Sequence, residues 1–429
     1  LCRAGYVDDP TLAALYRHAR LLAFPSLHEG FGLPLLEAMS CGCPVLGSET
    51  GAIPEVAAGA ARLCEPKSAE SVAEGLEELL TSERLRTSLR ERGLQRAREF
   101  SWHEAAHKTA SVLRSAAERR LFSAGPDLVS KLTDSPPVSP ASPDRRPRLF
   151  WYSPFPPDPG GVSAYSASLL HEIADWFDIT LVRDAELEPV QGLDGFPVIT
   201  PYQAAAAEAD LRVYHMGNNL AQCAHTFDAL RAVPGLTVVH DLNIHGFLLE
   251  YLVRSAPPGK LKGTALERHA YFRALSEAHG EAGTGQARQV LGNGALPDIA
   301  RFPCHRLLTA ASTALITHSR WGRDRLEANG DPAPVFTLPL GIEHPLAAPP
   351  GADAKLRRVI GAGEQDFVLA CAGYLEPNRR LDSVILALAE LVRRDITARL
   401  VLAGGIDPSH RRWLENIAQE RGIADRITW

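Results

Sequence analysis

The stretch PSLHEGFGLPLLEAM, residues 25–39, places two carboxylates, Glu29 and Glu37, on either side of a glycine-rich turn. Pro34 suits the first turn of a helix, because proline has no backbone N–H to leave unsatisfied there. Glycines let backbone amides approach a ligand closely, and the start of a helix favours anions. The stretch therefore predicts a diphosphate site, with Glu37 placed to bind a ribose diol and Glu29 placed to bind sugar hydroxyls.

This segment resembles the donor-binding domain of the retaining glycosyltransferases of family 4, which have the GT-B fold. The family motif reads E-G-F-G-x-P-x-x-E-A-M-x-x-G-x-P-V, and the resemblance covers about residues 3–115. It implies that Glu29 contacts the sugar as a catalytic residue and that the turn offers backbone amides to the donor. The residues that the resemblance assigns to the donor here are Glu29, Phe31, Gly32, Leu33 and Glu37.

The rest of the chain alternates between apolar strand patterns and helical patterns, which indicates an α/β protein with parallel sheets. Residues 121–147 are rich in proline and serine and are typical of an extended linker. The resemblance implies a GT-B arrangement, in which two Rossmann-like domains with parallel sheets face a cleft. It interprets residues 1–120 as the C-terminal part of a donor domain, 148–345 as an acceptor-side domain, and 346–429 as the first part of another donor domain.

Two short segments of the middle block are candidates for the acceptor side of a site. Gly160 and Gly161 follow the first strand of that block, either as a glycine loop toward the ligand or as a structural turn. His240 ends a strand, where ligands meet open α/β sheets. The resemblance implies that Gly160 and Gly161 bind the donor and that His240 lies beside the transferring sugar as a catalytic residue.

The last block contains GYLEPNRR, residues 373–380, where the family usually has G-R-L-x-P-x-K-G. The usual Arg and Lys neutralise the donor diphosphate as its charge grows in the transition state. Here Tyr374 replaces the arginine, while Arg379 keeps the second charge and can grip phosphate bidentately. Arg379 is therefore a catalytic candidate and Arg380 a donor-binding candidate, and a solvated basic pair is the alternative.

The order of these blocks raises the prospect of a composite domain. The chain begins at Leu1 inside an element already under way and stops at Trp429 in what looks like a strand cut short, which suggests a fragment of a tandem two-transferase protein. The part that the last block lacks is homologous to the first block. Because unpaired strand edges seek partners, we expect residues 1–120 to complete the sheet begun by residues 346–429.

Together these features indicate an enzyme that transfers a sugar, with retention, from a UDP- or GDP-linked donor to a glycan or glycolipid acceptor. The resemblance suggests surface polysaccharide or glycolipid synthesis in the cytoplasm, at the inner face of a membrane. No cofactor beyond the nucleotide sugar is implied, and without an Asp-x-Asp motif no metal is expected. The alternatives are another enzyme of the same fold, such as a phosphorylase or epimerase, or a non-catalytic sugar-nucleotide-binding scaffold within a larger synthase.

Bulk composition adds few constraints. The net charge of −6 gives no support for binding nucleic acid, and the seven scattered cysteines predict reduced, mostly buried thiols. No stretch reaches the ~18 apolar residues of a membrane span. The apolar run FLLEYLV, residues 247–253, could contact lipid peripherally, although a buried helix suits it better.

Overall fold

A computed structural model describes most of the chain and divides it into two compact units. The first unit combines the residues up to Ser101 with Leu340–Trp429, and the second is Trp102–Pro339. The described residues are 7–118, 145–158, 160–184, 190–253, 264–293, 297–299, 301–328, 333–343, 357–358, 360–363 and 366–429.

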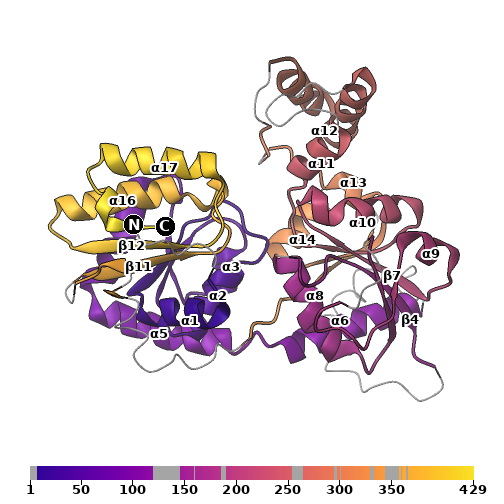
Figure 1. The fold of residues 1–429 in the computed structure, drawn as a ribbon, viewed down its shortest axis with the longest axis horizontal. Helices are drawn as coiled ribbons and strands as arrows, with labels where there is room; N and C mark the ends of the chain where they lie inside the picture. Colours follow the sequence, from indigo (N-terminus) through magenta and orange to yellow (C-terminus); the bar gives the residue numbers. More distant parts are fainter. Residues whose placement is uncertain are drawn as a thin grey trace. The chain divides into compact units, whose positions relative to one another are not determined.

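The first unit contains a six-stranded parallel sheet built from both ends of the chain (Figure 1). Strand β1 pairs with β11, so that Leu21 lies opposite Leu369 and Leu22 opposite Ala370. This pairing confirms the expectation that the first block completes the sheet of the last. The strands, in sheet order, are β13 (Ile427–Thr428), β12 (Ala398–Ala403), β11 (Phe367–Ala372), β1 (Leu21–Phe24), β2 (Val45–Ser48) and β3 (Arg62–Cys64).

Counted from β11, this order reads 3-2-1-4-5-6, the usual order of a doubly wound dinucleotide-binding sheet. The chain forms strands four to six first and strands one to three last, so its order is permuted. In Figure 1, α16 and α17 cover one face of the sheet, and α1, α2 and α5 cover the other. The helices of this unit are α1 (Asp9–His18), α2 (Leu33–Ser40), α3 (Ile53–Ala57), α4 (Ala69–Thr81), α5 (Glu83–Ala97), η2 (Pro377–Arg379), α16 (Leu381–Arg393), α17 (Pro408–Glu420) and η3 (Ala424–Arg426).

One hydrophobic core joins the two segments of this unit. Leu76 on α4 and Leu388 on α16 are both fully buried in it, together with Leu21 and Leu369 of the paired strands. Since apolar residues from both segments fill the same layer, neither segment buries its own strands alone.

The second unit has a seven-stranded parallel sheet of the same design. Counted from β4, its order is 3-2-1-4-5-6-7. The strands in sheet order are β6 (Val198–Ile199), β5 (Asp178–Val182), β4 (Arg148–Tyr152), β7 (Leu211–Met216), β8 (Gly235–Val239), β9 (Ser312–Thr317) and β10 (Val335–Thr337). The helices are α6 (Trp102–Ala117), α8 (Gly161–Ile173), α9 (Pro201–Ala206), α10 (Leu220–Ala232), α11 (His245–Leu252), α12 (Ala265–Asn293, with a kink at Gly280), α13 (Arg306–Thr309) and α14 (Arg320–Glu327).

Several boundaries differ from the expected blocks. The first unit ends at Ser101 rather than at residue 120, because α6 packs against α8 within the second unit. The chain passes back into the first unit at Leu340 rather than at residue 346. Most of the predicted linker, residues 121–144, lies outside the described residues. Of the apolar run 247–253, Phe247, Leu248 and Val253 are buried in the core.

Candidate functional site

The loops that carry the predicted donor residues lie at the switch point of the first sheet. Strands β11 and β1 are neighbours there, and the chain leaves them in opposite directions along the sheet. In open α/β sheets, ligands bind outside the carboxyl ends of the strands at this point. The loop after β1 contains Glu29, and the loop after β11 contains Arg379. The fold therefore brings together two candidate residues that are 350 positions apart.

Glu29 and Arg379 form an ion pair whose side chains are only 13% and 17% exposed, respectively. The Arg379 guanidinium group also donates to Ser26 Oγ at 3.3 Å and to the Tyr374 carbonyl oxygen at 3.3 Å. It lies 4.7 Å from the centre of the Phe24 ring. These contacts hold the cation in one place, which is the preorganisation that electrostatic catalysis requires.

Asn378 fixes the loop before Glu29. Its side chain accepts from the His28 amide at 3.0 Å and donates to the His28 carbonyl at 2.8 Å. Its own carbonyl accepts from the Leu27 amide at 2.9 Å. On the other side, Thr50 donates to the Leu27 carbonyl at 2.8 Å. We did not predict Asn378, although it lies within the quoted segment 373–380, directly before Arg379.

The glycine-rich turn leads into α2 as predicted. Gly32 has a φ of +101°, and a Cβ atom there would lie 2.6 Å from Cδ1 of Ile53, so only glycine fits. Leu33 begins the helix, and no side chain caps its first amides. Phe31 is buried and its ring meets that of Phe100 edge to face at 5.6 Å. The start of α2 is thus the kind of positive helix end that binds anions.

Glu37 lies on α2 and accepts a hydrogen bond from the Tyr16 hydroxyl at 3.1 Å. Burial raises the pKa of the Glu37 carboxyl group, while the bond from Tyr16 and the charge of Arg379 lower it. Burial, followed by the Glu37 charge, raises the pKa of Tyr16 well above its usual value. The Tyr16 hydroxyl therefore stays protonated and acts only as a donor to Glu37. The carboxylate is therefore held at one oxygen by Tyr16, a residue that our prediction missed.

Arg380 and Tyr374 occupy different surroundings. Arg380 is paired with Asp382 at 2.9 Å and donates to Ser383 Oγ at 3.0 Å, so its charge is balanced by a carboxylate at the start of α16. Tyr374, which stands where the family has arginine, is 61% exposed. Of the cations in this segment, Arg379 is the one that meets the predicted catalytic carboxylate.

In the second unit, the other predicted residues also follow the carboxyl ends of strands. Gly160 precedes α8 with a φ of +133°, and Gly161 has open space where a Cβ atom would project. The loop after β4 and the start of α10 lie close together, since a Cβ atom on Gly160 would be 3.7 Å from Gln222 Oε1. His240 follows β8. Gly160 thus lies at the switch point of this sheet, between β4 and β7.

His240 belongs to a chain of three histidines at the carboxyl ends of β7, β8 and β9. Its Nε2 lies 3.0 Å from Nδ1 of His215, and its Nδ1 lies 3.3 Å from Nε2 of His318. His318 Nδ1 is 2.9 Å from the Leu338 carbonyl oxygen. Both ring nitrogens of the predicted catalytic His240 therefore have partners within the protein.

The end of this chain fixes its tautomers. The Leu338 carbonyl can only accept, so His318 donates from Nδ1 and accepts at Nε2. It follows that His240 and then His215 also donate from Nδ1, which leaves Nε2 of His215 as a buried acceptor. Burial lowers the pKa of all three rings, to about 4 for His318 and well below the usual value for His215 and His240. The chain is consequently neutral at physiological pH.

These shifts predict that the protein loses stability in mild acid. Below pH ~6.5 the unfolded chain binds protons that the folded histidines do not, so the free energy of unfolding falls by about 1.4 kcal/mol per pH unit for each histidine. The loss continues down to the folded pKa, about 4 for His318. In urea titrations between pH 4.5 and 7.5, His215→Phe should remove one histidine's share of this slope. An unchanged slope in His215→Phe would contradict the neutral chain.

The comparisons with known proteins concern mainly the first part of the chain. Residues 2–96 match the family described as "Glycosyl transferases group 1". The chain is similar to an O-antigen chain mannosyltransferase B of Escherichia coli, with 39% identity over 25% of this chain and 28% of the relative. It is also similar to an MMP alpha-(1->4)-mannosyltransferase of Mycolicibacterium hassiacum, with 40% identity over 26% of this chain and 28% of the relative. A third relative is a D-inositol 3-phosphate glycosyltransferase of Corynebacterium aurimucosum, with 35% identity over 24% of this chain and 25% of the relative.

These matches support a glycosyltransferase of the GT-B type and cover about a quarter of the length of those three relatives. The matched part carries the Glu29–Glu37 segment, while Arg379 comes from outside it. Among the described residues, no helix is long and apolar enough to cross a membrane. The described part of the chain also contains no group of three or more His, Cys, Asp or Glu residues that could hold a metal ion.

Proposed function

We propose that this protein transfers a hexosyl group from a nucleotide sugar to an acceptor hydroxyl, with retention at the anomeric carbon. The observation that carries the proposal is the Glu29–Arg379 ion pair at the switch point of the first sheet. It places an acidic group for sugar hydroxyls beside a fixed cation for the diphosphate, next to the uncapped start of α2. The names of the relatives favour mannose as the sugar and polysaccharide or glycolipid synthesis as the setting.

Each residue has one role in this proposal. Glu37 binds the ribose, and the amides of the turn at Phe31, Gly32 and Leu33 bind the sugar and phosphates. Arg379 neutralises the leaving diphosphate as its bond to the sugar breaks, and the acceptor attacks from the same face with help from the donor's phosphate. In the second unit, Gly160 and Gly161 bind the donor, while His240, whose ring nitrogens are both bonded within the histidine chain, lies beside the sugar as a neutral ring. Arg380, which pairs with Asp382, holds the loop that carries Arg379 against the start of α16.

The proposal is tested by screening UDP- and GDP-linked sugars for thermal stabilisation of the full chain, followed by a donor-hydrolysis assay. We expect at least one nucleotide sugar to raise the unfolding temperature and to be hydrolysed slowly, and Glu29→Ala to abolish the turnover. Stabilisation without turnover in either protein would favour a non-catalytic binding role, which the exposed Tyr374 in place of arginine also favours. The absence of any stabilisation would overturn the proposal.

The Tyr16–Glu37 bond gives a pH-dependent test of the ribose site. Ribose binding requires an ionised Glu37, so donor affinity should fall as the pH falls through the raised pKa of that carboxyl group. Tyr16→Phe removes a bond that stabilises the ionised form, and it should raise the pH of this transition and weaken donor binding about fivefold at neutral pH. Donor affinity measured by calorimetry against pH provides the test. Tyr214→Phe, which removes a buried tyrosine hydroxyl in the second unit, is the matched control; an equal effect in both would argue against this role.

A further inference from the structure

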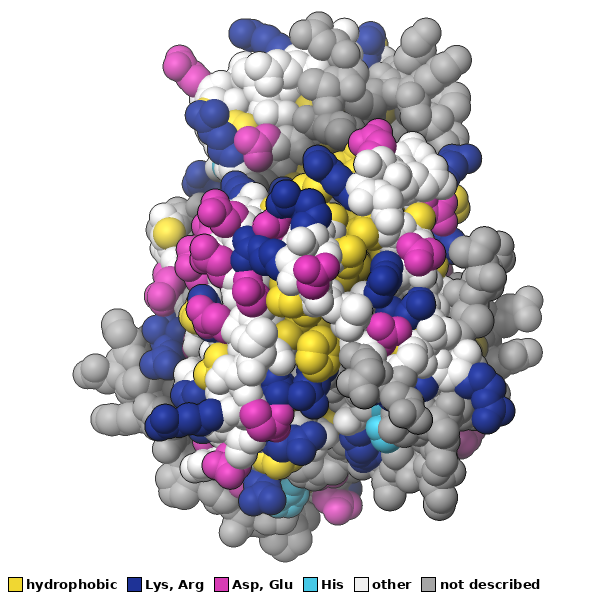
Figure 2. Space-filling view, turned by 90° about the vertical axis from the view of Figure 1, so that its left-hand side faces the viewer, with side chains coloured by type: hydrophobic (Ala, Val, Ile, Leu, Met, Phe, Trp, Pro, Cys, Tyr) yellow, Lys and Arg dark blue, Asp and Glu magenta, His cyan; other side chains and the backbone are white. Residues whose placement is uncertain are grey.

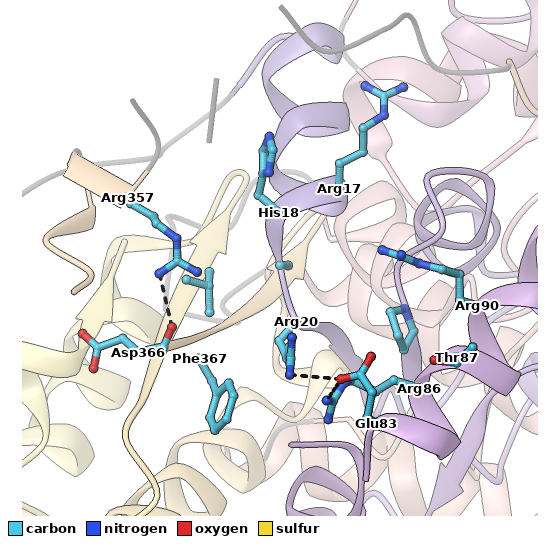
Figure 3. A pocket seen from close by; sticks show the side chains of 13 residues that line it. Arg17, His18, Arg20, Glu83, Arg86, Thr87, Arg90, Arg357, Asp366 and Phe367 are labelled. Atoms are coloured by element: carbon cyan, nitrogen blue, oxygen red, sulfur yellow. Dashed lines mark hydrogen bonds and ion pairs between the residues drawn. The ribbon is translucent and has the colours of Figure 1, made fainter. Parts of the chain in front are cut away.

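A hollow opens in the first unit, at the edge of its sheet opposite the proposed donor site. Arg20 directly precedes β1 and Phe367 begins β11, so this hollow lies at the amino ends of the same strands whose carboxyl ends carry Glu29 and Arg379. It has a volume of about 400 Å³ and is formed by the end of α1, one side of α5 and the segment before β11 (Figure 3). It is therefore separate from the proposed donor site.

Positive side chains dominate the lining. Figure 3 shows Arg20 and Arg86 meeting at Glu83, with Arg90 beside them and Arg357 on the other side of the hollow. The ionisable residues that line it are Arg17, His18, Arg20, Glu83, Arg86, Arg90, Arg357 and Asp366. Five arginines thus face two carboxylates.

Most of the arginine charge here is not balanced by the bonds that hold the side chains. Arg86 donates to the Leu80 carbonyl at 2.7 Å and Arg90 to the Gly42 carbonyl at 2.8 Å. Arg357 donates to the Gly363 carbonyl at 2.8 Å. Carbonyl oxygens accept hydrogen bonds but carry no net charge. The Arg90 guanidinium group is therefore fixed in position by a neutral acceptor, whereas Arg86 is also paired with Glu83.

The two carboxylates cannot offset this excess. Glu83 is shared between Arg20, at 3.3 Å, and Arg86. Asp366 pairs with Arg399 at 2.9 Å, and Arg399 does not line the hollow. Burial, and then the charge of Arg86, lower the pKa of Arg20, and its buried Nε has no hydrogen-bond partner. The hollow thus contains arginine side chains that are already held in place, and one N–H donor, Nε of Arg20, that has no hydrogen-bond partner.

We propose that this hollow binds a phosphorylated ligand through Arg20, Arg86 and Arg90. Arginine forks match phosphate oxygens bidentately, and the volume lies in the range of small-molecule sites. The view of the first unit in Figure 2 shows Lys and Arg side chains interspersed with Asp and Glu rather than gathered on one broad basic face. A discrete phosphate group in a hollow fits this surface better than a long polyanion lying across it.

The test is calorimetric titration of the full chain with inorganic pyrophosphate in an Arg379→Gln background, which weakens phosphate binding at the proposed donor site. Arg20→Gln should weaken pyrophosphate binding at least about tenfold. Glu83→Gln should tighten it severalfold, because the carboxylate competes for Arg20 and Arg86. Arg62→Gln is the matched control, since Arg62 also pairs with a glutamate, Glu78, in the first unit but lies away from the hollow.

A second arm distinguishes a soluble phosphate ligand from a lipid headgroup, by co-sedimentation with phosphatidylcholine vesicles with and without phosphatidic acid. Pyrophosphate binding that depends on Arg20 indicates a soluble ligand. Arg20-dependent binding only to the phosphatidic acid vesicles indicates a headgroup, and both results support the site. Binding in neither arm, or equal losses in Arg20→Gln and Arg62→Gln, would overturn it. Thermal unfolding of each variant without ligand checks that the first unit is folded.

Discussion

Replacing Arg379 by Gln is expected to lower kcat/KM for the nucleotide sugar by about 10²–10³-fold, mostly through kcat. The guanidinium group is held by Glu29, Ser26 and the Tyr374 carbonyl, so it needs little rearrangement to meet charge that develops on a departing diphosphate. Glutamine keeps the approximate size but cannot supply the charge. Steady-state kinetics with the donor identified by screening would measure the effect.

Arg394 offers a closely matched control. It too lies in Leu340–Trp429 and pairs with a glutamate of the other segment, Glu77. It is more exposed than Arg379, and exposed pairs contribute little. Arg394→Gln should therefore keep nearly full activity. Equal losses in the two variants, or near-normal activity in Arg379→Gln, would contradict a catalytic role for Arg379.

A double variant can distinguish two roles for Glu29, which are to position Arg379 alone or also to bind the sugar. If Glu29 only positions Arg379, the double variant Glu29→Gln/Arg379→Gln should be no slower than Arg379→Gln alone. If Glu29 also binds the sugar, the double variant should be slower by a further factor. The comparison works because residues that act as a unit give non-additive effects. We expect the further loss.

The second large effect concerns the joint core. Leu388→Ala on α16 should lower the free energy of unfolding of the first unit by about 3 kcal/mol, as is typical when a buried leucine is truncated. Leu388 is fully buried and shares its cluster with Leu76 and Leu21 of the other segment. Its loss should therefore destabilise β1 and β2 as much as β11 and β12, although they lie far away in sequence.

Native-state hydrogen exchange can measure directly whether the destabilisation reaches the strands of both segments. In Leu388→Ala, amides of β1 that bond across the sheet, such as that of Leu22, should exchange faster by the same factor as amides of β11. Leu170→Ala, a fully buried leucine in the second unit, should leave both strands unchanged. Faster exchange confined to β11–β13 would show that the two segments fold independently.

Local patterns in the sequence were sufficient to predict the strands that lead into each site. The glycine turn before α2 and the buried runs of β1 and β11 are each visible in a few residues. The joint sheet was also predictable, since the last block lacks the part that the first block resembles. The pairing of Leu21 with Leu369 agrees with that reasoning.

Side-chain partnerships were harder to predict, because they depend on which strand ends become neighbours. Glu29 and Arg379 meet only because β1 and β11 are adjacent, and Tyr16 reaches Glu37 only because α1 packs against α2. The histidine chain did leave a signal, as His215, His240 and His318 each lie at the end of a strand. With the order β7-β8-β9 known, their proximity follows.

The central claim is that one donor site is built from both segments of the first unit. It is tested most directly by calorimetric titration of a nucleotide sugar into the full chain, Glu37→Ala and Arg379→Gln. These residues come from the first and the last part of the chain, respectively. We expect one donor site in the unmodified chain and at least about tenfold weaker binding in both variants. Donor binding that survives unchanged in either variant would contradict a site shared by the two segments.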